Sequence, residues 1–150
     1  MAITRCANFY GGGDLNFNRI VPGTIKSILF NQSPIIRSDG DYIRDYLYIK
    51  DAVKAYLRLA ENLQKEEVQG KAFNFGTDTP IKVLELVKKI LKLSDSNHLK
   101  PIILGEVKSE IKVQYLDSSK AEKILGWKPI YDLDTGLQET ILWYKDFFGL

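Results

Sequence analysis

Cysteine and histidine are almost absent from this chain of 150 residues, which contains one of each, Cys6 and His98. A single cysteine cannot form an internal disulfide, and together with one histidine it supplies no metal-binding cluster. His98 falls in a polar loop over residues 94–100, where solvated side chains are far more common than catalytic ones. The composition therefore excludes a disulfide-stabilised scaffold and predicts no metal site. It is typical of a reducing, cytoplasmic compartment.

Long hydrophobic runs and a strong charge of one sign are also missing. The longest apolar candidate, residues 81–93, is interrupted by charged residues, whereas a membrane-spanning helix needs about 20 consecutive apolar residues. The N-terminus has no basic stretch followed by an apolar segment, so a signal peptide is not expected. The net charge of +2 is too small to indicate nucleic acid or an anionic membrane as a partner.

What is present predicts one mixed α/β unit, since 45% of the residues are hydrophobic and the charged 27% are of both signs. Residues 2–9 read as a buried strand, which needs neighbouring strands that nothing before it supplies. The other extended segments are expected at 34–36, 45–49, 72–75, 102–104 and 112–116. Helices are expected at 19–31, after Asp51, after Thr79-Pro80, at 118–125 with Gly126 ending it, and after Asp134.

The helix after Asp51 shows a helical recurrence of apolar residues, which predicts the face that it turns to the core. That predicted face consists of Val53, Tyr56, Leu57, Ala60 and Leu63. Asp51 itself is predicted to cap the start of this helix.

No catalytic residue and no cofactor loop are expected in the chain. Glycines 11 to 13 are adjacent, whereas a dinucleotide fingerprint needs spaced glycines and a helix that opens directly behind them. We therefore interpret this run as a turn. We also expect no activated tyrosine base, although Tyr46 is followed by a lysine four positions later, Lys50.

The polar residues near predicted strands are of the kind that binds a ligand. Arg44 precedes a strand, and two interpretations are open: a bidentate contact to phosphate, or a surface ion pair with Asp41 or Asp45. Asn74 lies within an apolar strand and either satisfies neighbouring backbone or faces a ligand. Asn8 is a similar case, at a strand end where open α/β sheets bind ligands.

Five segments, in order and spacing over nearly the whole chain, resemble the extended short-chain dehydrogenase/reductases that act on nucleotide sugars. They are residues 4–14 (R-x-x-N-x-x-G-x-G-D), 19–22 (R-I-x-P), 40–51 (G-x-x-x-R-D-x-x-x-V-x-D), 72–76 (x-x-N-x-G), and 116–121 with 125–129 (D-x-S-K-A and L-G-W-x-P). Within that family the chain looks most like CDP-glucose 4,6-dehydratase. It departs from that pattern at 44–46, and at 107–110, where many relatives carry an arginine that this chain lacks.

The resemblance implies a role for each matching residue. The backbone at Cys6 and Ala7 would touch NAD. The substrate-binding residues would be Asn8, Arg19, Ile20, Arg44, Asn74 and Glu110, with Arg19 and Ile20 near the base and ribose, Arg44 and Asn74 on the diphosphate, and Glu110 near the ribose hydroxyls.

The resemblance also implies the domain organisation and the reaction. The chain would be the C-terminal, substrate-binding portion of such an enzyme, with remnants of the Rossmann sheet at about 1–9 and 44–76 and their apolar faces exposed or covered by another copy. The whole NAD-dependent lyase would oxidise C4 of the sugar, remove water across C5–C6 and return the hydride to C6. The chain alone would not bind NAD or turn over. The alternatives are part of an NDP-sugar epimerase and a non-enzymatic nucleotide-sugar binding protein. Assembly of the chain as a homo-oligomer is left open.

Overall fold

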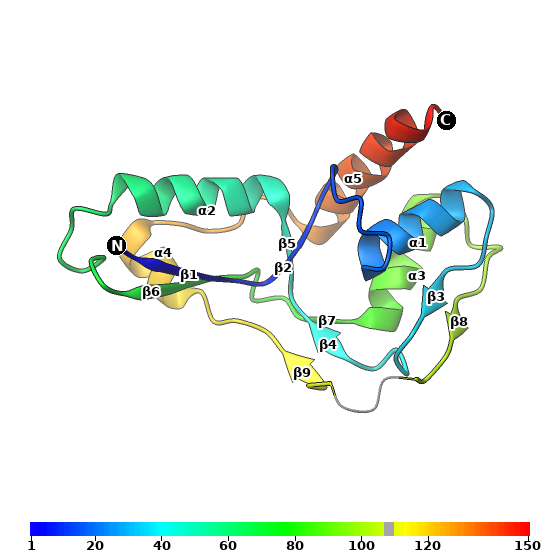
Figure 1. The fold of residues 1–150 in the computed structure, drawn as a ribbon, viewed down its shortest axis with the longest axis horizontal. Helices are drawn as coiled ribbons and strands as arrows, with labels where there is room; N and C mark the ends of the chain where they lie inside the picture. The colour runs from blue at the N-terminus through cyan, green and yellow to red at the C-terminus, as the bar shows by residue number, and fades with distance from the viewer. Residues whose placement is uncertain (107–109) are drawn as a thin grey trace.

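The computed structural model describes residues 1–106 and 110–150 and is a mixed α/β structure (Figure 1). Its helices are α1 (Ile20–Leu29), α2 (Ile49–Glu61), α3 (Val83–Leu93), α4 (Ser119–Leu125) and α5 (Leu133–Phe148). Its strands are β1 (Ile3–Cys6), β2 (Asn8–Tyr10), β3 (Ile35–Ile36), β4 (Ile43–Arg44), β5 (Tyr46–Tyr48), β6 (Ala72–Phe75), β7 (Ile81–Lys82), β8 (Ile102–Ile103) and β9 (Val113–Gln114). None of the helices in the described residues is long and apolar enough to cross a membrane.

The first strands form two short parallel ladders that follow one another along the chain. β1 pairs with β6, and β2 pairs with β5, both in parallel. Ala7 joins the two ladders, because its backbone N–H donates to the carbonyl of Phe75 at 2.9 Å. Helices α2 and α4 pack with β6 around one apolar cluster, which contains Phe73, Phe75 and Trp127. We call this region, β1 with β6, α2 and α4, the sheet layer.

The second region lies beside the sheet layer and contains α1, α3 and α5 (Figure 1). These helices enclose an apolar cluster that includes Ile25, Leu86, Leu137 and Tyr144, each fully buried. Short strands line its lower edge: β3 pairs with β8, and β4 lies between β7 and β9. We call this region the cleft body.

Three predicted helix starts are wrong, each for a local reason. α2 begins at Ile49, so that Asp51 lies inside its first turn, where the carboxylate accepts the backbone N–H groups of Ile130 and Tyr131. α3 begins at Val83 rather than after Thr79-Pro80, because residues 81–82 first pair with β4. α5 begins at Leu133, and its cap is Asp132, which accepts from Thr135 N–H.

The predicted buried face of α2 is also wrong. Val53, Tyr56 and Leu57 are 52%, 48% and 58% exposed. The helix instead turns its smaller residues inward, with Ala52, Ala55 and Leu59 among those buried. In contrast, α1 lies within its predicted range of 19–31 and ends two residues earlier, and Gly126 ends α4 in the left-handed conformation as expected.

The expected exposure of the strand faces holds for β1 alone. Ile3 in β1 is 48% exposed, and no residue of that strand is fully buried. The three residues of β5 are buried, and so are the two phenylalanines of β6. The prediction is therefore wrong for β5 and β6. The α2–α4 cluster covers Leu47 of β5 and the phenylalanines of β6, whereas Tyr46 and Tyr48 of β5 lie in the cluster between α1, α3 and α5.

Candidate functional site

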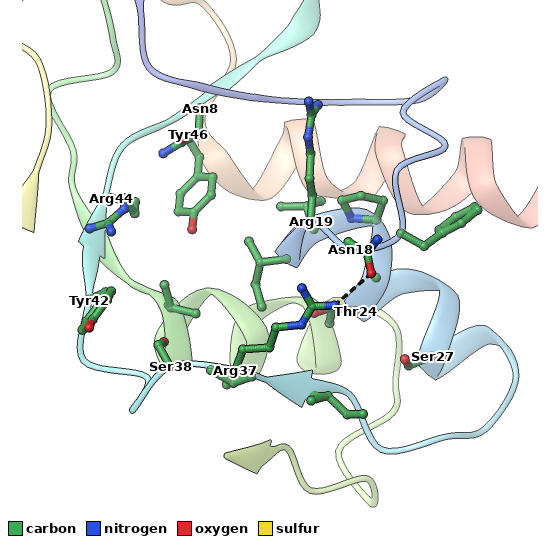
Figure 2. A pocket seen from close by; sticks show the side chains of 18 of the residues that line it. Asn8, Asn18, Arg19, Thr24, Ser27, Arg37, Ser38, Tyr42, Arg44 and Tyr46 are labelled. Atoms are coloured by element: carbon green, nitrogen blue, oxygen red, sulfur yellow. Dashed lines mark hydrogen bonds between the residues drawn. The ribbon is translucent and has the colours of Figure 1, made fainter. Parts of the chain in front are cut away.

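A cleft of about 870 Å³ lies between the start of α1, the strands β2 to β5 and the beginning of α3. Six of the eight residues expected at a ligand site line this cleft: Ala7, Asn8, Arg19, Ile20, Arg44 and Glu110. Figure 2 shows Asn8, Tyr46 and Arg44 toward one end of it, and Asn18, Thr24, Arg37 and Ser27 toward the other. Residues separated by up to about a hundred positions in sequence are thus brought to one concave surface, which is the usual form of a small-molecule site.

Arg44 is the most buried charged side chain of the cleft, with 7% of its surface exposed. Its Nη1 donates to the carbonyl of Ile43 at 2.9 Å and to that of Lys112 at 3.3 Å, and its Nη2 lies 2.8 Å from Oε1 of Glu110. The ion-pair partner is therefore Glu110, and not Asp41 or Asp45 as one interpretation had it. These contacts hold a fixed positive charge in the cleft wall, with one partner that a ligand oxygen could replace.

Asp45, the neighbour of Arg44, serves the fold rather than the cleft. Its carboxylate accepts the backbone N–H of Thr77 and also bonds the Thr77 hydroxyl, which ties β5 to the turn after β6. Burial raises the pKa of Asp45, and its hydrogen bonds to Thr77 lower it. Gly76 is required beside this carboxylate, since a Cβ there would lie 2.2 Å from Oδ2 of Asp45.

Tyr46 and Asn8 occupy paired positions on β5 and β2 at the same end of the cleft. Burial raises the pKa of Tyr46 to about 12, an effect that the nearby Arg44 guanidinium partly offsets. The phenol therefore stays protonated at neutral pH and acts as a hydrogen-bond donor or acceptor, not as a base. Asn8 donates through Nδ2 to the carbonyl of Asp45 at 3.3 Å.

The tyrosine–lysine spacing at positions 46 and 50 does not produce a catalytic pair. Tyr46 lines the cleft from β5, whereas Lys50 lies in the first turn of α2 and its ammonium bonds Glu139 on α5. The Tyr48 hydroxyl donates to the same Glu139 carboxylate at 2.6 Å. A lysine that lowers a tyrosine pKa has to lie beside the phenol, and here the phenol has a raised pKa and the lysine is engaged elsewhere.

The start of α1 forms one wall of the cleft. Arg19 precedes the helix, no side chain caps it, and Pro22 in its first turn has no N–H. Uncapped helix starts attract anions, because their N–H groups point outward and the helix dipole is positive there. The Arg19 guanidinium itself extends away from Arg37 and pairs with Asp14 at 3.1 Å, so its charge is already balanced (Figure 2).

Two of the expected site residues do not line the cleft. Asn74 is half-buried on β6 and donates to the carbonyl of Asp117 at 3.1 Å, which corresponds to the interpretation that it satisfies neighbouring backbone. Cys6 is half-buried on β1, near Thr4 and Tyr56, and burial raises the pKa of its thiol. Both lie in the sheet layer, on β1 and β6, outside the cleft lining.

The cleft residues that were not expected from the sequence include the polar side chains of Asn18, Thr24 and Arg37. Arg37 is exposed and donates through Nη2 to Oδ1 of Asn18 at 2.8 Å (Figure 2). Thr24 lies on the buried face of α1. The sequence does place Arg37 directly after a predicted strand. Polar residues at strand ends often bind ligands in open α/β sheets, which is also the reason for the prediction of Asn8.

The glycine run has a packing role, which agrees with its interpretation as a turn. A Cβ at Gly11 would lie 2.4 Å from Ile49, and a Cβ at Gly12 would lie 2.3 Å from the Trp143 ring. Helix α1 begins only at Ile20, so its N-terminus does not follow these glycines directly. Among the described residues, no group of three His, Cys, Asp or Glu side chains is arranged to hold a metal ion.

Comparisons with known proteins give the following matches. Residues 1–76 match the model of a family described as "NAD dependent epimerase/dehydratase family". A dTDP-D-glucose 4,6-dehydratase of Bos taurus is 30% identical over 159 residues, covering 99% of this chain and 42% of that protein. A putative UDP-glucose 4-epimerase of Methanocaldococcus jannaschii is 36% identical over 150 residues, covering 97% of this chain and 46% of that protein.

A solved structure agrees with the fold. The UDP-glucose 4-epimerase of Thermotoga maritima, crystallised with UDP-glucose, matches with a TM-score of 0.87 and 29% identity, covering 98% of this chain and 46% of that one. The chain thus spans less than half the length of these relatives. Their names include both dehydratases and epimerases, and the nucleotides named are dTDP and UDP, so the prediction of a CDP-sugar remains untested.

Proposed function

Since the chain belongs to the NAD-dependent epimerase/dehydratase family, we propose that its cleft binds the nucleoside diphosphate part of a nucleotide sugar. The observation that carries this proposal is Arg44, a buried guanidinium in the wall of the same cleft that contains the uncapped start of α1. The guanidinium marks the end of the cleft for the diphosphate, and the start of α1 adds positive potential along the cleft wall. The amide of Asn8 and the neutral phenol of Tyr46 lie at the same end and can bond the oxygens of such a ligand.

Glu110 is the partner of Arg44 that a phosphate group can replace. Its carboxylate is half exposed and bonds only one of the two terminal nitrogens of the guanidinium, while backbone carbonyls hold the other. A phosphate oxygen can therefore displace Glu110 without unfolding the strand around Arg44. The released carboxylate would then be free for the ribose hydroxyls, the role that its sequence context implies.

For the whole protein we propose an NAD-dependent 4,6-dehydration of a nucleotide sugar, with a CDP-sugar as the first candidate. NAD would supply the oxidation and later reduction of the sugar. Cys6 and Ala7 are the residues of this chain that would contact NAD through their backbone. Of the two, Ala7 lines the cleft, and its N–H donates to the carbonyl of Phe75. The chain's own part is to bind and orient, because binding energy from the nucleotide can position the sugar for chemistry.

A second candidate is an NDP-sugar epimerase, which the putative UDP-glucose 4-epimerase and the structure with UDP-glucose favour. Both candidates need the same nucleotide site. Among residues 1–106 and 110–150 the cleft side chains include no activated acid–base pair. We expect no turnover of CDP-glucose, dTDP-glucose or GDP-mannose by these 150 residues alone. The third candidate, a nucleotide-sugar binding protein without catalysis, also requires this site. Measurable turnover by the 150-residue chain would exclude this third candidate.

Calorimetric titration of the 150-residue chain with CDP and UDP tests the proposal. Arg44→Ala should weaken the tighter of the two by about 1.5–3 kcal/mol, the range for a hydrogen bond to a charged group. Arg44→Lys should recover part of the loss, because an ammonium cannot reproduce the planar fork. The matched control is Arg58→Ala, which removes an exposed arginine of α2 and should leave binding unchanged.

Two results would contradict the proposal. One is a native chain that binds neither nucleotide at millimolar concentration. The other is an Arg44→Ala variant that keeps its native circular dichroism and binds as tightly as the parent, which would make Arg44 a structural ion-pair residue.

A further inference from the structure

The hydroxyl of Thr24 is a buried polar group without a partner. Thr24 is 2% exposed, lies on α1 and lines the cleft, yet its Oγ1 makes no hydrogen bond in the described structure. A threonine within a helix commonly bonds the carbonyl one turn back, and this one does not. A buried hydroxyl without a hydrogen bond destabilises a protein. At a cleft wall such a hydroxyl marks a position where a ligand atom can form the missing hydrogen bond.

Arg37 supplies unused donors at the same end of the cleft. Its guanidinium is exposed and forms no ion pair within residues 1–106 and 110–150, in contrast to Arg19 with Asp14 and Arg44 with Glu110. In the described residues its one side-chain hydrogen bond is to Oδ1 of Asn18, a neutral acceptor that orients the guanidinium and uses a single N–H. The remaining N–H groups of the guanidinium donate only, and none can accept.

The orientation of the ligand in the cleft decides which part of it contacts Arg37 and Thr24. This step rests on the proposed function, in which the diphosphate lies at the Arg44 end of the cleft. The nucleobase of an extended nucleotide then reaches the opposite end, where Figure 2 shows Arg37, Asn18 and Thr24. A base at this end meets a planar two-pronged donor and a hydroxyl that can donate or accept.

We infer that Arg37, oriented by Asn18 and assisted by Thr24, selects a nucleobase whose edge presents two adjacent hydrogen-bond acceptors. Cytosine offers such an edge through O2 and N3, and guanine offers one through O6 and N7. Uracil and thymine place an N3–H donor between their carbonyl groups, so one prong of the guanidinium would face another donor. Adenine presents a single acceptor beside its amino group. Arg37 is then a specificity residue of the cleft.

The first test measures base preference in the 150-residue chain with CDP, UDP, GDP and ADP. The native chain should bind CDP about tenfold or more tightly than UDP, since a bidentate contact discriminates by that order. Arg37→Lys keeps the positive charge and loses the fork, so the ratio of the two affinities should fall close to one while UDP binding changes little. The matched control is Arg5→Lys on β1, outside the cleft, which should preserve the native ratio.

Thr24→Val gives a second readout that does not depend on Arg37. Valine has nearly the same shape and removes the unpartnered hydroxyl. The variant should therefore unfold at the same or a higher denaturant concentration, and it should bind CDP roughly fivefold more weakly. A hydroxyl with a purely structural role would give the opposite result, lower stability with unchanged binding.

The outcomes separate this inference from the proposed function. If the native chain prefers GDP over ADP and the Arg37→Lys variant loses this preference, guanine is the selected base and the inference holds. Equal binding of all four nucleotides by the native chain, or an equal loss for CDP and UDP in Arg37→Lys, would overturn it, while the Arg44→Ala result stands on its own. Absence of binding by every nucleotide would overturn both.

Discussion

The cleft body and the sheet layer differ in how each builds its buried apolar cluster. In the cleft body, α1, α3 and α5 meet around side chains such as Leu86 and Leu137, which are fully buried. In the sheet layer, α2 and α4 pack on β6. Both regions also expose large apolar side chains, such as Leu142 on α5 at 64% and Leu57 on α2 at 58%. The first cluster is formed between helices, and the second is formed between helices and strands.

The difference shows where a binding site can be held in a fixed geometry. The cleft lies beside the helical cluster, and its residues Arg44 and Thr24 are buried. The expected residues that fell outside the cleft, Cys6 and Asn74, belong to the sheet layer. The two regions are joined by Asp51, a buried α2 residue whose carboxylate holds the chain that leads into α5.

The largest expected effect compares the two regions directly through two leucines in the middle of helices. Leu86→Ala in α3 removes a fully buried side chain and should lower the free energy of unfolding by about 2–5 kcal/mol. Leu57→Ala in α2 removes a side chain that is 58% exposed and should change it by no more than about 0.5 kcal/mol. Denaturant unfolding measures both, and similar losses would mean that Leu57 is also buried in solution.

The next effect concerns the connection between the regions. Asp51→Ala removes the carboxylate that accepts the partly buried N–H groups of Ile130 and Tyr131 and should cost about 1.5–3 kcal/mol of stability. Asp51→Asn is the matched control. It keeps an oxygen at the bonded position and can place its nitrogen at the position of Oδ1, which has no partner. Thermal or denaturant unfolding should find the Asn variant clearly more stable than the Ala variant, and equal losses would show that the charge matters rather than the acceptor.

The smallest of the three effects appears at alkaline pH. Burial raises the pKa of Tyr46 to about 12, so above about pH 10 the unfolded chain loses this phenolic proton while the folded chain keeps it. The folded state then binds more protons, and stability must fall with rising pH, by up to about 1.4 kcal/mol per pH unit for this group. Tyr46→Phe should reduce the loss between pH 10 and 11. Tyr56→Phe, on the exposed face of α2, should not, and identical pH profiles for the two variants would contradict the burial of Tyr46.

The sequence was sufficient where local chemistry and packing agree. In α1 the large residues are also the buried ones, and Gly126 takes the left-handed conformation that ends α4. It was insufficient for α2, where alanines pack on the strands and the larger Val53 and Leu57 face outward, so that apolar periodicity favoured the wrong side. A capping role for Asp51 was equally plausible from the sequence, because its partners lie some 80 positions away.

The candidate site was predicted in part for the same reasons. Arg44 and Asn8 were found because they adjoin strands, and a family resemblance added Arg19 and Glu110. The ion pair between Arg44 and Glu110 needed the tertiary structure, since these residues are far apart in sequence. Thr24 gave no signal at all, because its missing hydrogen bond is visible only once the surroundings of α1 are known.

The most direct test of the central claim maps nucleotide binding onto the two regions by NMR of the ¹⁵N-labelled 150-residue chain, with CDP and UDP added separately. The account predicts that the largest amide shifts occur in the cleft, at residues such as Ile20, Ser38 and Arg44, while Thr4 and Asn74 in the sheet layer stay in place. Shifts concentrated on β1, β6 or α2, or no shifts with millimolar nucleotide, would contradict it.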